Sequence, residues 1–161
     1  MLKFVIFASV LCLYYVSSVE AISGTTIANK ADSHVESTKW SKASSHDTGR
    51  NTNKCNIFIN DVMKEVGGSV PQRSWWRHSP IGAGEWGNPH SSYLSDDNCW
   101  RNVGSPSIGD VMGDGVHVAF YTGYRTTTSA RYDKIVKNSW GFRSSGSGAE
   151  SNTYAYWRYI C

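Results

Sequence analysis

The chain has 161 residues, is 40% hydrophobic and carries a formal net charge of +3. That length suits one compact domain with its own core. No basic run or stripe of the kind that binds nucleic acid is present in the sequence, so we expect no nucleic-acid partner. A mildly basic protein suits an anionic surface such as a bacterial wall without requiring one.

The first segment, residues 1–21, reads MLKFVIFASVLCLYYVSSVEA. An early lysine, a short apolar run and small residues before a cleavage position are typical of a secretory signal peptide. The apolar run is shorter than the roughly 20 residues that a membrane span needs. We therefore expect residues 1–21 to be removed and residues 22–161 to form one secreted, extracellular domain with no membrane contact. The alternative is an uncleaved N-terminal anchor.

The strongest helix pattern runs from Lys54 to Val66 and follows a weaker one around residues 27–35 and a polar loop. Apolar residues recur on one face of the stronger helix, at Cys55, Ile59, Val62 and Val66. Thr52 or Asn53 is expected to cap its start, and Gly67-Gly68 to end it in a left-handed turn. Cys55 then lies on the buried stripe but at its exposed N-terminal end.

The middle region, residues 69–105, is rich in Pro, Gly and Ser and is predicted to be irregular. Its four tryptophans argue against disorder and are candidates to line a groove for sugar rings or peptide: Trp75, Trp76, Trp86 and Trp100. The same residues are equally well explained as packing anchors, because aromatic side chains dominate burial.

The C-terminal half predicts strands within residues 106–112, 116–124, 131–140 and 152–161. A Gly-Asp-Gly turn at residues 113–115 separates the first two, and a polar loop is expected at 125–130. Helices followed by strands indicate an α+β fold in which N-terminal helices pack on an antiparallel β-sheet.

Three cysteines remain after signal cleavage, which are Cys55, Cys99 and Cys161. An odd number in a secreted protein leaves one thiol over, and three pairings are possible. The position of Cys55 at a helix start favours it as the free thiol, which leaves Cys99 and Cys161 as the disulfide pair.

A catalytic arrangement follows if the second and third of these strands form a hairpin that turns between Thr127 and Thr128. His117 then lies opposite Asn138, and directly opposed residues share a face of the sheet. An amide oxygen in that place orients the imidazole and fixes its tautomer. The start of the Cys55 helix, placed over this face, completes a Cys–His–Asn arrangement.

Each residue type has a chemical role in that arrangement. A helix N-terminus and a nearby imidazolium are expected to lower the pKa of the Cys55 thiol, whose thiolate attacks a carbonyl carbon. His117 takes the thiol proton and returns it to the leaving amine, while Asn138 holds the ring. The Cys55 backbone N–H can donate to the oxyanion, and Asn51 and Asn53 are candidates for a second donor.

Taken singly, these residues have ordinary explanations. A lone cysteine in a secreted chain is more often bridged than catalytic, a strand histidine is usually structural, and Asn138 can simply shape a strand end. The predicted register and the odd thiol together favour the catalytic interpretation.

Two stretches resemble known cysteine peptidases. KNSWG at residues 137–141 is similar to the stretch that carries the asparagine of papain-like enzymes. PSIGDVM…HVAFYTG resembles the Pro-x-x-Gly-Asp-Val and His-Val-x-x-Tyr-x-Gly pattern of the NlpC/P60 and CHAP cell-wall peptidases. Over residues 40–161 the chain resembles the type VI amidase effector 2 family, in particular the secreted effectors that arthropods acquired from bacteria.

That resemblance implies a papain-like fold and a secreted, antibacterial cysteine amidase that hydrolyses peptidoglycan between D-alanine and the diamino acid of a neighbouring stem peptide. It assigns Cys55 as nucleophile and His117 as base. Asn138 is assigned less firmly, because related enzymes vary the third group. We expect bacterial peptidoglycan as partner, no cofactor, no metal and a monomer.

Two other functions compete with this hypothesis. A zinc amidase is disfavoured because the sequence has no HExxH motif and no close pair of metal ligands. A wall-binding module that recognises glycan through its tryptophans and cuts nothing would be favoured by a bridged Cys55.

Overall fold

The computed structural model describes residues 21–74, 76, 78–139 and 154–161. The predicted signal peptide, except its last residue, and the candidate Trp75 lie outside the described residues. Within those ranges no helix is long and apolar enough to cross a membrane.

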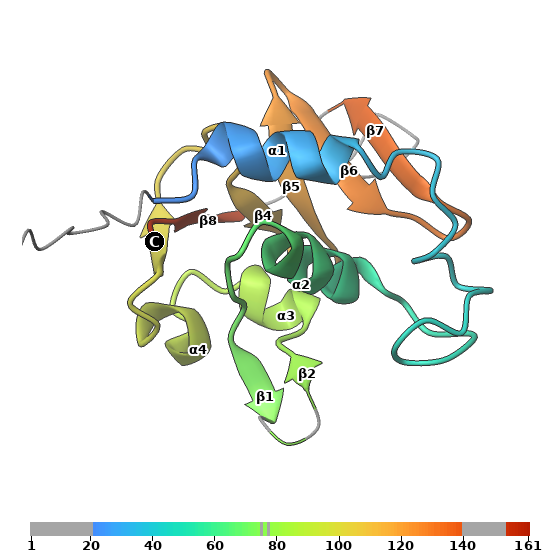
Figure 1. The fold of residues 1–161 in the computed structure, drawn as a ribbon. Helices are drawn as coiled ribbons and strands as arrows, with labels where there is room; N and C mark the ends of the chain where they lie inside the picture. Colours follow the sequence, from blue (N-terminus) through green and yellow to red (C-terminus); the bar gives the residue numbers. More distant parts are fainter. Residues whose placement is uncertain (1–20, 75, 77, 140–153) are drawn as a thin grey trace, which may run out of the picture.

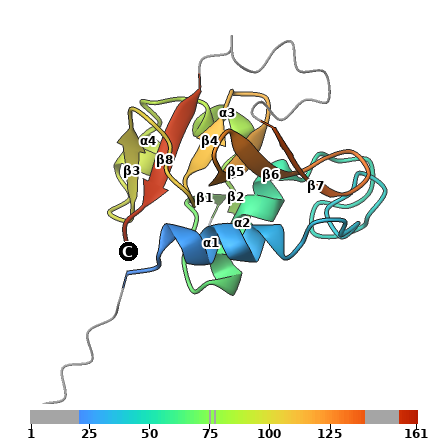
Figure 2. The same cartoon turned by 90° about the horizontal axis from the view of Figure 1, so that it is seen from above.

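A six-stranded antiparallel sheet forms the centre of the fold, with the strand order β3-β8-β4-β5-β6-β7. Figures 1 and 2 show the helices and the sheet from two perpendicular directions. The strands of this sheet are β3 (Trp100–Val103), β4 (Val111–Gly113), β5 (Val118–Gly123), β6 (Thr126–Ala130), β7 (Ile135–Ser139) and β8 (Ala155–Tyr159).

Helices α1 (Gly24–Asp32) and α2 (Cys55–Glu65) pack against β5 and β6. The chain between α2 and β3 forms a small two-stranded sheet and two short helices: β1 (Gln72–Ser74), β2 (Ser79–Pro80), α3 (Ala83–Trp86) and α4 (Ser92–Ser95). The predicted α+β class, with N-terminal helices on an antiparallel sheet, is confirmed.

Successive side chains of β5 point to opposite faces of the sheet, as they do in any β-strand. Val118 and Phe120 belong to the main core, which also contains Ile27 of α1 and Phe58 of α2. Ala119 points to the other face and belongs to a smaller apolar cluster. The helices therefore cover one face of the sheet, and that face contains the main core.

Two of the four candidate tryptophans belong to this core. Trp86 is 0% exposed and Trp100 is 4% exposed, and their rings meet edge to face at 4.9 Å. The prediction that Trp86 lines a substrate groove is wrong, and Trp100 borders only a surface pocket whose lining does not include Cys55. They are the packing anchors that the alternative explanation gave, and the apolar area they bury stabilises the middle region.

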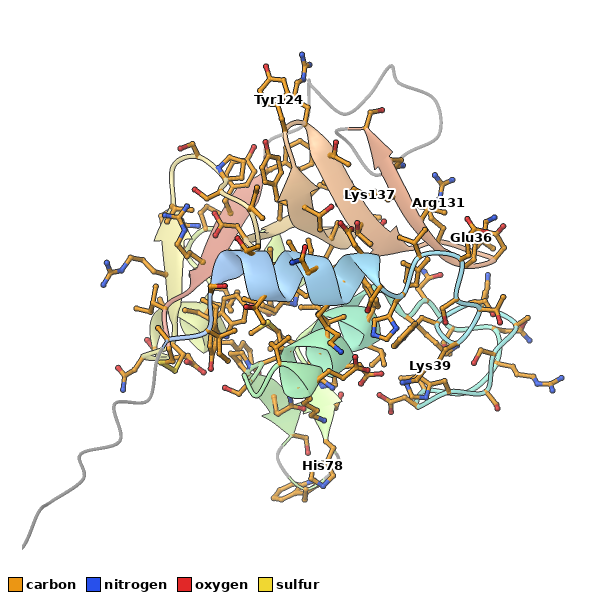
Figure 3. All side chains as sticks on the ribbon, turned by 45° about the horizontal axis from the view of Figure 1, so that its top comes forward. Glu36, Lys39, His78, Tyr124, Arg131 and Lys137 are labelled. Carbon is orange, nitrogen blue, oxygen red and sulfur yellow. A yellow bond between two sulfur atoms is a disulfide. The ribbon has the colours of Figure 1, made fainter. Side chains whose placement is uncertain are left out.

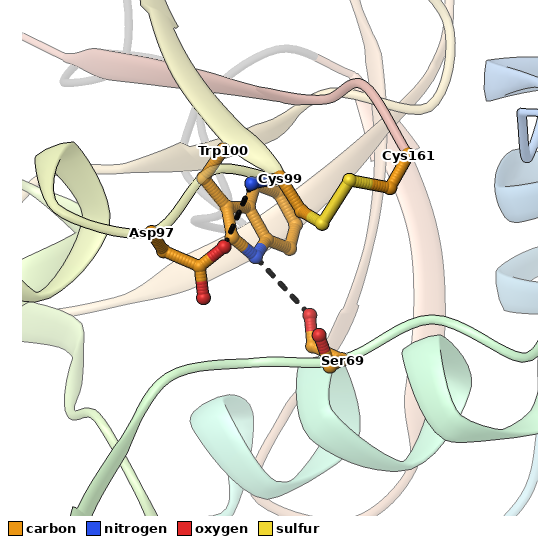
Figure 4. The surroundings of a disulfide bond; sticks show 5 residues. All are labelled: Ser69, Asp97, Cys99, Trp100 and Cys161. Carbon is orange, nitrogen blue, oxygen red and sulfur yellow. Dashed lines mark hydrogen bonds between the residues drawn. A yellow bond between two sulfur atoms is a disulfide. The ribbon is translucent and has the colours of Figure 1, made fainter.

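The disulfide joins Cys99 to Cys161, and Cys55 is free, so the pairing expected from the helix argument is confirmed. Figure 4 shows the bond beside Trp100, whose indole N–H donates to the Ser69 carbonyl at 3.1 Å. The bond ties the C-terminal residue to the start of β3.

Strand β6 was predicted to be a loop, and its presence changes the register of the sheet. Residues 126–130 pair with β5 on one side and with β7 on the other. Their polar side chains are satisfied inside the fold, because the Thr128 hydroxyl lies 2.9 Å from that of Thr122 and 2.5 Å from an Asp32 carboxylate oxygen. Consequently β5 and β7, predicted to be neighbours, are separated by a whole strand.

Candidate active site

Helix α2 places a cysteine at its first turn, as the spacing predicted. It begins at Cys55, one residue later than expected, and Gly67, with φ +85°, follows its end as expected. The predicted cap by Thr52 or Asn53 is wrong, since Lys54 is the N-cap residue and no side chain caps the helix. The backbone N–H groups of the first turn are therefore not bound by a capping side chain.

A tight turn directs His117 toward the start of α2. Gly115 adopts φ +86°, and one oxygen of Asp114 accepts backbone N–H bonds from Val116 at 2.8 Å and His117 at 2.6 Å. An Asp that binds backbone groups in this way fixes the direction of a turn. The Gly-Asp-Gly sequence was the signal for the turn, but Asp114 was missed as a residue that positions His117.

Cys55 and His117 line the same pocket, which has a volume of about 280 Å³. That volume lies just below the roughly 300–1,000 Å³ found for ligand pockets. Asn53 also lines the pocket and remains a candidate oxyanion donor. Asn51 is exposed, with φ +62°, and is not among the lining residues.

Cys55 is only 7% exposed, and this burial raises the pKa of its thiol above the ordinary value of 9.0. The nearby backbone N–H groups of Asn56, Val118 and Cys55 itself lower the pKa by less than burial raises it, and the Asp114 carboxylate raises it further. The expected lowering of the pKa is therefore wrong for the free protein. Desolvation of the thiolate outweighs the helix N-terminus, and the resting group is a thiol.

The packing of α2 against β5 brings the two residues together. Val118, the first residue of β5, directly follows His117, and α2 begins at Cys55. The predicted proximity of Cys55 and His117 is supported by this packing and by the shared pocket.

Asn138 does not lie opposite His117. It pairs with Thr127 of β6, whose hydroxyl donates to the Asn138 side-chain oxygen at 3.3 Å, and Thr127 pairs in turn with Tyr121 of β5. Arg131, which directly follows β6, lines the pocket together with His117. The predicted His117–Asn138 pair is wrong, because β6 lies between β5 and β7 in the sheet.

Three cations that sequence reasoning missed line the pocket: Lys42, Lys54 and Arg131. Lys54 is 2% exposed, and its ammonium donates to the Ser41 and Gly49 carbonyls at 3.2 and 2.8 Å and to the Thr52 hydroxyl at 3.2 Å. Its partners lie in the loop before α2, and the sequence does not show how that loop folds. The only sign in the sequence that Lys54 belongs to the site is its position next to Cys55. Figure 3 shows Arg131 on the same side as Lys39, with Tyr124 at the far end of the sheet.

The loop between α1 and α2 forms one wall of the pocket and is fastened to α2 through Asp61. One Asp61 oxygen accepts the Trp40 indole N–H at 2.9 Å and lies 2.7 Å from Nε2 of His46 and 3.6 Å from Nζ of Lys39. Trp40 is buried and lines the pocket. These bonds hold the loop in place over the start of the helix.

Of the candidate tryptophans that the structure describes, Trp76, Trp86 and Trp100, none lines this pocket. Trp76 is 68% exposed in the turn between β1 and β2, and nothing in the structure connects it with Cys55. Among the residues that the structure describes, no group of three or more His, Cys, Asp or Glu side chains is arranged to hold a metal ion.

We found no family model, no curated protein and no solved structure that matches this chain. The functional argument therefore rests on the residues of the pocket.

Proposed function

We propose that this protein is a secreted cysteine amidase that hydrolyses stem-peptide cross-links of bacterial peptidoglycan, at the bond between D-alanine and the diamino acid. The observation that carries the proposal is that a free cysteine at the N-terminus of α2 lines one pocket together with His117. The bond specificity comes from the sequence resemblance to amidase effectors. The Cys99–Cys161 disulfide supports an oxidising, extracellular environment.

The reaction begins with a neutral thiol, because burial raises the Cys55 pKa. His117 takes the thiol proton as the sulfur attacks the amide carbonyl, so that the thiolate forms only with substrate in place. The carbonyl oxygen gains the negative charge, and first-turn N–H groups at Cys55 and Asn56 are suited to stabilise it.

Collapse of that intermediate breaks the carbon–nitrogen bond. His117 returns its proton to the leaving amine, which leaves a thioester between the acyl half of the peptide and Cys55. Water then attacks the thioester with His117 as base, which releases the carboxylic acid and the thiol. No residue is assigned as the third member, since Asn138 pairs with Thr127 instead of His117. Asp114 positions the backbone of His117.

The test is digestion of purified peptidoglycan by the chain lacking residues 1–21, by its Cys55→Ala variant and by an Arg101→Gln control. Arg101 is exposed on β3 and does not line the pocket. Mass analysis should find cross-linked dimers lost with the parent and the control, and retained with Cys55→Ala. Equal cutting by all three would remove Cys55 from the mechanism. Binding to the wall with no cutting by any of them would make the protein a recognition module.

A further inference from the structure

The loop that forms one wall of the Cys55 pocket has an unfavourable backbone conformation. Three of its residues have a positive φ, which are Asp47 at +56°, Gly49 at +81° and Asn51 at +62°. For residues other than glycine this conformation costs free energy and persists where surrounding contacts hold it. Figures 1 and 2 show that this part of the chain projects at one side of the molecule, between α1 and α2. Specific contacts are therefore needed to keep the loop against the start of α2.

Lys54, the N-cap residue of α2, reaches into this loop and makes such contacts. It is 2% exposed, and Nζ donates to the Ser41 carbonyl at 3.2 Å and to the Gly49 carbonyl at 2.8 Å. Nζ also donates to the Thr52 carbonyl at 3.4 Å and to the Thr52 hydroxyl at 3.2 Å. One ammonium thus joins both ends of residues 41–52 to the helix.

The Lys54 charge is buried among neutral oxygens, which is a costly arrangement. None of its four acceptors belongs to a carboxylate, and burial of a charge costs free energy unless its partners compensate. If the ammonium is removed, each of these oxygens loses a charged donor. Water can replace that donor when the loop moves away from the helix, so loss of the ammonium favours an open loop.

An open loop would change the surroundings of Cys55. Lys42, Thr52 and Asn53 of the loop line the same pocket as the cysteine, which is 7% exposed. Burial is the main cause of the raised pKa of the Cys55 thiol. Opening of the loop would hydrate the sulfur and move this pKa back toward the ordinary value of 9.0.

We propose that Lys54 is a positioning residue, whose ammonium holds residues 41–52 against the start of α2 and keeps the pocket wall closed over Cys55. This inference rests on the proposed function, in which Cys55 is the nucleophile, and it adds a residue that acts on the site through the loop. Loss of the ammonium should expose the sulfur and weaken the binding of substrate.

The test is the rate at which iodoacetamide alkylates Cys55 in the folded chain lacking residues 1–21. Lys54→Met keeps most of the side-chain length and removes the charge. We expect this variant to react at least about tenfold faster than the parent, the factor by which one hydrogen bond to a charged group shifts a local opening equilibrium. An unchanged rate would overturn the proposal. A slower rate would overturn it as well, because it would show that the Lys54 charge activates the thiolate directly.

Two further variants separate closure of the wall from general effects. Lys64→Met removes the same charge from an exposed position in the last turn of α2 and should react at the parental rate. Equal acceleration in it would show a general charge effect and overturn the proposal. Thr52→Val keeps the charge and the shape but removes one acceptor, and it should accelerate alkylation about threefold. If Lys54→Met does not fold, Thr52→Val decides, and a parental rate in it would overturn the proposal.

Low concentrations of urea distinguish opening of the loop from unfolding of the whole domain. Local opening exposes little surface, so below the unfolding transition the alkylation rate of Lys54→Met should depend only weakly on urea. A steep dependence would show that the thiol reacts through global unfolding. Lys54 would then have a purely structural role, and the proposal would be overturned.

Alkylation measures the thiol whether or not the protein hydrolyses peptidoglycan, so it separates the two proposals. In hydrolysis we expect Lys54→Met to raise KM more than it lowers kcat, because a loosened wall binds substrate less well. Faster alkylation of Lys54→Met without hydrolysis by the parent would leave the role of Lys54 and refute the hydrolase. Hydrolysis by the parent with parental alkylation of Lys54→Met would leave the hydrolase and refute the role of Lys54.

Discussion

The two cysteine environments of this protein differ in what surrounds the sulfur. Cys99 and Cys161 are joined beside Trp100, whose ring packs against Trp86 and Tyr159. Cys55 is free in a pocket lined by cations and a histidine, and hydrogen bonds and ion pairs to Asp61 hold the adjoining loop. One region stabilises the fold by covalent and apolar means, and the other places polar groups around a reactive atom. Changes in the two regions should therefore affect different measurements.

Removal of the proposed base should give the largest change in activity. We expect His117→Ala to lower kcat for peptidoglycan hydrolysis by about 10²–10⁴-fold, the range for general acid–base catalysis. The melting temperature should change little, because His117 lies in a pocket wall and not in the core cluster. His90→Ala is the matched control, since His90 is exposed and outside the pocket. A His117→Ala enzyme with parental kcat would remove the histidine from the mechanism.

Loss of the disulfide should act on stability instead. The bond closes a segment with a sequence separation of 62 residues, so we expect Cys99→Ser with Cys161→Ser to lower the free energy of unfolding by about 4 kcal/mol. Denaturant titration measures this change. At 25 °C, below the unfolding transition, kcat/KM should remain close to the parental value. A large fall in kcat/KM of the folded variant would contradict the separation of the two regions.

Asp61 belongs to the region around Cys55, and its role is to hold the loop that forms one wall of the pocket. Its side chain is 17% exposed and accepts the Trp40 indole, so Asp61→Ala should cost about 1–3 kcal/mol of unfolding free energy and also raise KM, because the pocket wall loosens. The control is Glu65→Ala, which removes a more exposed carboxylate that contacts Lys30 and His34. Unchanged KM in a destabilised Asp61→Ala would show that the loop does not depend on this anchor.

The pH dependence follows from the raised pKa of Cys55. Because the folded state favours the neutral thiol, its contribution to stability is complete below the ordinary pKa of 9.0 and is lost as the pH rises through the higher folded value. Alkylation of the folded protein should keep accelerating above pH 9.0, after the rate for the urea-unfolded chain has levelled off. A plateau below pH 8 would instead indicate a thiolate stabilised by His117 in the free protein.

Asn138 should give the smallest effect. Asn138 lies in β7, two strands from β5, which follows His117, and it pairs with Thr127 of β6. Asn138→Ala should therefore change kcat/KM by less than about twofold, as expected for a residue that does not touch the reacting groups. Steady-state kinetics with a peptide substrate would measure this. A hundredfold loss with an unchanged melting temperature would restore Asn138 as the third catalytic residue.

The sequence was sufficient where periodicity or local chemistry determined the structure. The apolar spacing of Cys55, Ile59 and Val62 predicted the helix, and the Gly-Asp-Gly sequence predicted the turn before His117. The free thiol and the disulfide followed from the cysteine count and that helix.

The sequence was insufficient where polar groups are satisfied by distant partners. Thr127, Thr128 and Ser129 are polar, which predicts a loop, yet they are buried in β6, and Thr128 binds Asp32 from α1. Three successive threonines were a signal for a strand, since β-branched residues favour that conformation. The missing strand shifted the register and led to the wrong partner for His117. The burial of Lys54 has no local signal, because its ammonium is bound by a folded loop.

The central claim is that the Cys55 sulfur performs the reaction, and stoichiometric alkylation tests it without any substitution. The mature chain is treated with iodoacetamide until intact mass shows one carbamidomethyl group per chain, the modified residue is located by peptide mapping, and peptidoglycan hydrolysis is then measured. We predict that modification at Cys55 abolishes hydrolysis in proportion to its extent while the disulfide stays intact. Full modification of Cys55 with undiminished hydrolysis would contradict the account.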